Sequence, residues 1–114
     1  MTWRPFDGGS TIGQHGSEDG EIVRDEEHED EARARITLER GGHTAPFAIT
    51  CGIAGWMLHT RFFGSESKAQ VEFEGMKEAL ARILATIPLT SDPVAETKVQ
   101  AAMLSIAEFV ERFP

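Results

Sequence analysis

Cys51 and His59 are the two residues whose chemistry comes closest to that of a nucleophile and its general base. Cys51 is the only cysteine of the 114-residue chain, and His59 follows it by eight positions. A catalytic dyad needs the two side chains in contact, about 3 Å apart. A hairpin that pairs Gly52 with Gly55 turns them to opposite faces of a sheet, and only a three-residue turn or a bulge would return them to one face. The spacing therefore favours a core role for Cys51.

A run of seven polar residues, DEEHEDE, occupies positions 25–31 and is the second candidate for chemistry. Carboxylates and the imidazole of His28 are ligands that divalent metals accept. The run lacks the alternating acids, central glycine and late glutamate of a calcium-binding EF-hand loop. We therefore expect no metal site here, but a solvated acidic loop that can attract a basic partner. Its acids are Asp25, Glu26, Glu27, Glu29, Asp30 and Glu31.

Other catalytic signatures are absent from the sequence. It contains no serine-hydrolase elbow, phosphate loop or dinucleotide fingerprint, and its four histidines lack metal-ligand spacing. A single cysteine excludes an internal disulfide and every multi-cysteine metal site. We expect no cofactor, and a non-enzymatic protein is favoured over an enzyme.

The net charge of −8 is concentrated in the first quarter of the chain. Residues 1–31 carry ten acids and two bases, whereas residues 32–114 carry nine of each. Nucleic acid is therefore not an expected partner, because its phosphates require a basic surface. The sequence also opens without a charged and then apolar leader, so we expect a cytoplasmic protein.

The least polar stretch, Ala45–Phe63, predicts a two-stranded hairpin. Aromatic and β-branched residues flank its glycines, as is typical of strands. A membrane span needs about 20 apolar residues, and this run is interrupted by Pro46, Gly52, Gly55 and His59. We expect no membrane association.

A third strand precedes the hairpin. Residues 32–40, ARARITLER, alternate apolar and polar side chains, and Gly41-Gly42 marks a turn. Folding this strand back with Arg40 near Ala45 makes apolar residues meet throughout. The predicted pairs are Leu38 with Phe47, Ile36 with Ile49 and Ala34 with Cys51, and across the hairpin Cys51 with Trp56, Ile49 with Leu58 and Phe47 with Thr60.

Two amphipathic helices follow Gly64. Ser65 or Ser67 can cap the first helix and Pro88 stops it, while Asp92 and Pro93 signal the start of the second. Apolar residues recur at intervals of three and four, which predicts two core-facing stripes. They are Ala69, Phe73, Met76, Leu80, Ile83, Leu84 and Ile87 in the first, and Ala95, Val99, Ala102, Met103, Ile106, Val110 and Phe113 in the second.

These elements predict an α+β fold of the order β-β-β-β-α-α. An antiparallel sheet of three to four strands buries one face under both carboxyl-terminal helices. Residues 21–114 form the single α+β domain, with a possible short strand at residues 21–24. Residues 1–20 form a mobile or loosely docked arm, for which Trp3 and Phe6 are possible anchors.

The second face of the sheet is the candidate site. The predicted pairing gives it cationic and apolar side chains from two strands: Arg33, Arg35, Met57, His59, Arg61 and Phe63. Three interpretations fit this surface: an ordinary solvated face, a homodimer or partner interface, and a pocket in which arginine grips an anionic small molecule.

We expect a small acidic protein that acts by protein-protein contact, as a regulator or as an inhibitor of the immunity type. The acidic run and the lack of a catalytic constellation favour this interpretation. The alternative is a binder of an anionic small molecule, or a minor enzyme, that uses the arginines and histidine of the open face.

Overall fold

A computed structural model describes residues 2–29, 32–88 and 95–114. Asp30 and Glu31 of the acidic run, and the predicted helix start at Asp92 and Pro93, lie outside the described residues. The elements are β1 (Trp3–Pro5), a 3₁₀ helix η1 (Phe6–Gly9), β2 (Glu21–His28), β3 (Ala34–Arg40), β4 (Phe47–Ile53), β5 (Met57–Phe63), α1 (Glu66–Leu84) and α2 (Ala95–Arg112).

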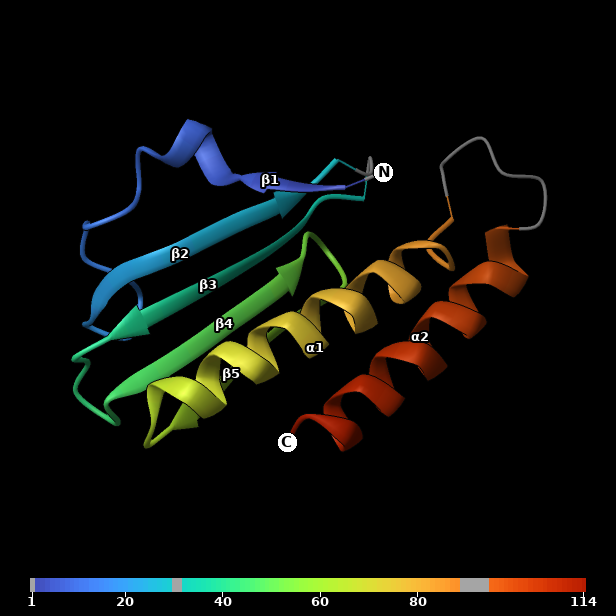
Figure 1. Cartoon of the computed structure of the whole chain (residues 1–114). Coiled ribbons are helices and arrows are strands. Elements are labelled where there is room, and N and C mark those ends of the chain that lie inside the picture. Colours follow the sequence, from blue (N-terminus) through green and yellow to red (C-terminus); the bar gives the residue numbers. More distant parts are fainter. Residues whose placement is uncertain (1, 30–31, 89–94) are drawn as a thin grey trace.

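The predicted α+β architecture is confirmed. All neighbouring strands pair antiparallel in the order β1-β2-β3-β4-β5, and both helices follow the sheet (Figure 1). The sheet has five strands rather than three or four, because Trp3–Pro5 adds a short edge strand in which Trp3 pairs with His28. The predicted division into an arm and a domain at residue 20 stays a prediction.

The first helix forms as its sequence pattern predicts. The Ser65 hydroxyl accepts a hydrogen bond from the Lys68 backbone N–H at 3.4 Å and so caps α1. α1 lies across β3, β4 and β5. Its predicted apolar stripe is buried throughout: Ala69, Phe73, Met76, Leu80, Ile83, Leu84 and Ile87.

The second helix packs mainly on α1, and only its last turn reaches the sheet. Ala102, Phe109 and Phe113 are buried, and the carbonyl oxygen of Phe113 meets His59 of β5. The predicted stripe of α2 is therefore only partly core. Met103 is 61% exposed, because α2 lies beside α1, beyond β5, rather than over the sheet (Figure 1).

The predicted faces of β3 and β4 are correct, although their register is shifted. Leu38 pairs with Ile49 instead of Phe47, because a longer loop, closed by a hydrogen bond from Gly41 N to Pro46 O at 2.8 Å, separates the strands. The shift is two residues, which leaves every side chain on its predicted face. The buried residues of the pair are Ala34, Ile36, Leu38, Ile49, Cys51 and Ile53.

The predicted register of the β4–β5 hairpin is wrong. Ile53 pairs with Met57, and the loop holds three residues, Ala54 to Trp56. Trp56 N donates to Ile53 O at 2.9 Å, and Gly55 has the positive φ of 80° that this turn requires at its third position. Cys51 consequently pairs with His59 instead of Trp56, an odd shift that moves every side chain of β5 to the face opposite to the predicted one.

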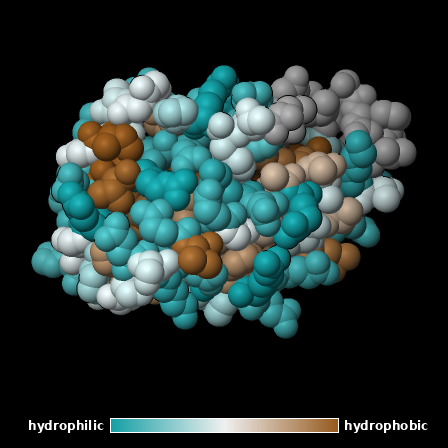
Figure 2. Space-filling model, in the orientation of Figure 1, coloured by the Kyte–Doolittle hydropathy of each residue, from teal (hydrophilic) through white to brown (hydrophobic). Residues whose placement is uncertain are grey.

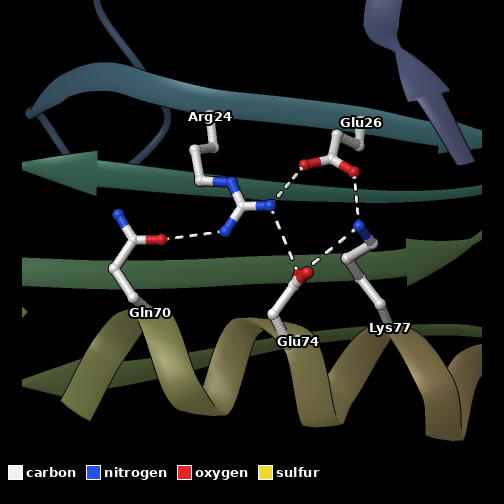
Figure 3. A network of polar contacts seen from close by, with 5 residues as sticks. All are labelled: Arg24, Glu26, Gln70, Glu74 and Lys77. Atoms are coloured by element: carbon white, nitrogen blue, oxygen red, sulfur yellow. Dashed lines mark hydrogen bonds and ion pairs between the residues drawn. The ribbon is translucent and has the colours of Figure 1, made fainter. Parts of the chain in front are cut away.

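A polar network joins β2 to α1 on the helix side of the sheet (Figure 3). The Arg24 guanidinium donates to Gln70 at 2.8 Å and lies 4.0 Å from the centre of the Phe73 ring. Lys77 Nζ lies 2.6 Å from a carboxylate oxygen of Glu26. The surface on this side is mainly hydrophilic, with separate hydrophobic spots (Figure 2). The network thus helps to fix α1 across the sheet.

Candidate functional site

The six residues of the predicted site do not share one face. Arg33 and Arg35 belong to the open face, which the helices leave uncovered. The corrected hairpin register turns the four residues from β5 to the helix side instead. These four are Met57, His59, Arg61 and Phe63.

Arg61 is a structural residue that holds the end of α2 against the sheet. Its side chain is 10% exposed, and its guanidinium lies 3.1 Å from a Glu72 carboxylate oxygen. Its Nε donates to the carbonyl oxygen of Pro114 at 3.2 Å. The Phe63 and Phe113 rings lie 4.9 and 5.3 Å from the guanidinium carbon. No part of this arrangement leaves the cation open to an external anion.

Cys51 and His59 do meet on one face, through the three-residue turn that such a pairing requires. They nevertheless lack the properties of a catalytic dyad. Burial raises the pKa of the Cys51 thiol to about 12, against a smaller lowering by the charge of Arg61, so the reactive thiolate is absent near neutral pH. His59 Nε2 donates to the carbonyl oxygen of Phe113 at 2.5 Å. The predicted core role of Cys51 agrees with this geometry.

Cys51 is expected to resist alkylation in the native protein. At pH 8 a thiol reagent should react with it orders of magnitude more slowly than with the same protein in denaturant, because the thiol is buried and protonated. The thiol pKa is 9.0 without burial, so ionisation favours the unfolded chain as pH rises from about 9 to 12, and stability should fall over that range. Equal labelling rates with and without denaturant would contradict this burial.

Arg35 is neutralised by the buried Asp25, although its own side chain is 44% exposed. Its Nε and Nη2 donate to the two carboxylate oxygens of Asp25 at 2.9 and 2.6 Å, and this hydrogen bonding raises the pKa of Arg35. The Phe6 ring lies 3.6 Å from its guanidinium carbon. Asp25 also accepts from the hydroxyls of Thr11 and Thr37. The pair therefore ties the amino-terminal segment to the sheet.

The acidic run is not the solvated loop that its composition predicts. Residues 25–28 belong to β2, and strand alternation sends their carboxylates to both faces of the sheet. Asp25 is buried on the open face, Glu26 pairs with Arg24 and Lys77 on the helix side, and Glu27 pairs with Arg4. Each of these three acids has a base beside it, so little acidic surface remains along them.

A groove of about 840 Å³ occupies the part of the open face that stays free. Thr11 and residues 14–18 form one wall, which Glu39 holds by accepting hydrogen bonds from the Glu18 and Gly20 backbone N–H groups. Leu58 and Trp56 form the other wall. Between them lie threonines, of which Thr50 and Thr60 share a hydrogen bond, and the groove also reaches Ile22, Thr37 and Arg33.

The groove combines apolar walls, hydroxyl groups and two arginines, of which Arg35 is paired with Asp25. Arg33 has no side-chain partner among the residues that the structure describes. Sequence reasoning missed Trp56, Leu58 and Thr60, because the wrong hairpin register assigned them to the core. The available signal was the stretch between Ile53 and Met57, whose three residues include Gly55 and permit a three-residue loop instead of a two-residue one.

Neither a metal centre nor a membrane-crossing helix is found in the described ranges. No group of three or more histidine, cysteine or acidic side chains there is arranged to hold a metal ion, and neither helix combines the length and apolarity of a membrane span. No protein-family model, curated protein or solved structure matches the chain.

Proposed function

We propose that the protein acts by binding another protein, with the open-face groove as its contact surface. The observation that carries the proposal is an apolar wall held out to solvent: Leu58 is 79% exposed and lies beside Trp56 at the groove. Large apolar and aromatic side chains next to a hollow are typical of interaction sites. The role proposed is that of a regulator or an inhibitor, and the compartment proposed is the cytoplasm, which suits a single buried free thiol.

The net charge favours a basic partner. At −8 the chain attracts a basic protein over distances of about a Debye length, and such attraction raises association rates. We therefore expect the association rate to fall as ionic strength rises, while the dissociation rate changes little. An association rate independent of salt would remove the charge argument.

A matched pair of variants tests the groove. Leu58→Arg changes the groove wall, and Val71→Arg makes the same change at a 70% exposed position of α1 on the helix side. Neither should unfold the protein, since both side chains are exposed. Each of the three proteins is immobilised and exposed to a cell extract. Leu58→Arg should retain at least tenfold less of any protein that both the wild type and Val71→Arg retain. Equal retention by all three proteins would overturn the groove as the contact surface.

A second copy of the chain is the partner that sedimentation can detect directly. If the groove is a homodimer interface, the wild type should sediment as a dimer and Leu58→Arg as a monomer. If the wild type sediments as a monomer at all concentrations, the partner is a different protein.

Binding of an anionic small molecule is the weaker candidate. Arg35 is already bonded to Asp25, and His59 and Arg61 lie on the helix side, so Arg33 is the remaining cation of the groove. We expect phosphate, sulfate and citrate to change the melting temperature of the wild type no more than they change that of Arg33→Ala. A larger rise for the wild type than for Arg33→Ala would favour the anion instead, because ligand binding stabilises the native state.

A further inference from the structure

The two edges of the sheet differ in how they are protected. β1 is three residues long and ends in Pro5, and short strands and proline both hinder pairing with another chain. β5 is seven residues long and contains neither proline nor lysine. Its one arginine, Arg61, is drawn to the helix side by Glu72. The outer edge of β5 is thus longer than that of β1 and carries neither proline nor lysine, and its one protective feature is the inward-pointing charge of Arg61.

The helix beside this edge exposes apolar residues. Met103 and Val110 each follow a buried residue by one position, so both lie about 100° around the helix axis from the buried stripe. On the other side of that stripe, Ser105 and Glu108 line an outward hollow of about 360 Å³ together with the exposed Arg82 of α1. The side bearing Met103 and Val110 therefore faces the layer of the sheet.

That layer contains no strand beneath α2 in the described residues, because the sheet ends at β5. α2 lies beyond β5 in Figure 1, and its last turn is fixed there by His59 and Arg61. We use the name notch for the surface made by the outer edge of β5 and the side of α2 that bears Met103 and Val110. The apolar side of α2 therefore includes Met103 and Val110, which remain exposed within the chain.

We propose that the notch binds an extended segment of another protein, which adds to the sheet as a sixth strand. Unpaired N–H and C=O groups alternate along an edge strand, and extended backbone is the partner that satisfies them. Side chains on one face of the added strand would cover Met103 and Val110. The segment should therefore alternate apolar residues with polar ones.

Charge and geometry both select the occupant. Glu96 is exposed on α2 seven residues before Met103 and therefore on the same side of the helix, which favours lysine or arginine in the bound segment. A second copy fits less well. Antiparallel pairing of two β5 strands about a two-fold axis would bring both α2 helices to the same place above the joint, whereas an isolated strand carries no helix layer.

A displayed library of linear 12-residue peptides tests the notch on the intact chain. Enriched peptides should alternate apolar residues and contain lysine or arginine. Met103→Lys should weaken their binding at least tenfold, and Leu104→Lys, at a 66% exposed neighbouring position directed elsewhere, by less than twofold. A bound peptide should slow hydrogen exchange in Met57–Phe63. Arg33→Glu, a groove variant, should leave peptide affinity unchanged, which separates this test from that of the groove.

Several results would overturn the proposal. They are the absence of any enriched peptide, binding that Met103→Lys and Leu104→Lys weaken equally, and exchange protection confined to residues outside β5. A wild-type dimer that Met103→Lys dissociates would assign the notch to a second copy and would equally refute the occupant proposed.

Discussion

Replacing Asp25 with alanine is expected to lower the free energy of unfolding by about 2–3 kcal/mol, the cost of losing charged hydrogen bonds to a buried carboxylate, because the 44% exposed Arg35 side chain remains partly hydrated. The Asp25 carboxylate is fully enclosed and accepts four hydrogen bonds, two from Arg35 and one each from Thr11 and Thr37. Its loss leaves the Arg35 guanidinium without its carboxylate and frees the segment around Thr11. Urea unfolding followed by circular dichroism measures the difference.

Glu27 provides the control for Asp25, because both acids belong to the same run and to β2. Its pair with Arg4 is solvent-accessible, so Glu27→Ala should cost less than about 1 kcal/mol. Equal small effects of the two substitutions would mean that the acidic run is solvated, as its composition predicts, and that the Asp25–Arg35 pair is absent.

Replacing Arg61 with alanine should cost about 2–4 kcal/mol, from the loss of a charged hydrogen bond and of an enclosed ion pair. The substitution removes the contact with Glu72 and the hydrogen bond to Pro114, and exposes the rings of Phe63 and Phe113. Because these contacts hold the end of α2, its amides should exchange faster while those of β3 change little. Hydrogen exchange with mass spectrometry checks both regions.

Arg33→Ala is the matched control for Arg61→Ala. The sequence groups the two arginines on one surface, whereas the structure leaves Arg33 exposed at the groove and encloses Arg61. Arg33→Ala should change stability by less than about 0.5 kcal/mol, as is usual for exposed positions. Similar costs for the two variants would support the predicted register of the hairpin and contradict the observed one.

The helices and the β3–β4 pair could be predicted because their signals are redundant. Seven apolar positions at helical spacing define the buried side of α1, and one misplaced residue would not change the result. The β3–β4 register shifted by two residues without moving a side chain to the other face. Errors of even size are harmless in a strand, because its side chains alternate with a period of two.

The hairpin could not be predicted with the same security. Its register depends on whether the loop holds two or three residues, and the glycines at positions 52 and 55 fit either choice. Burial does not decide between the two, since β5 has large apolar residues on both faces: Met57 and Phe63 on one, Leu58 and Phe62 on the other. The predicted site was lost with this single odd shift.

The sequence by itself determined the class of fold, the two helices and the apolar side of β3 and β4, because periodicity records which side of an element is buried. Only the tertiary structure decided where the charges lie. Asp25 pairs with Arg35, Arg61 pairs with Glu72 near the end of α2, and Arg33 lies at the groove without a side-chain partner among the described residues. An ion pair depends on which strands become neighbours and in what register. A linear pattern of residues does not contain that information, so the groove and the notch beside β5 emerge only from the folded chain.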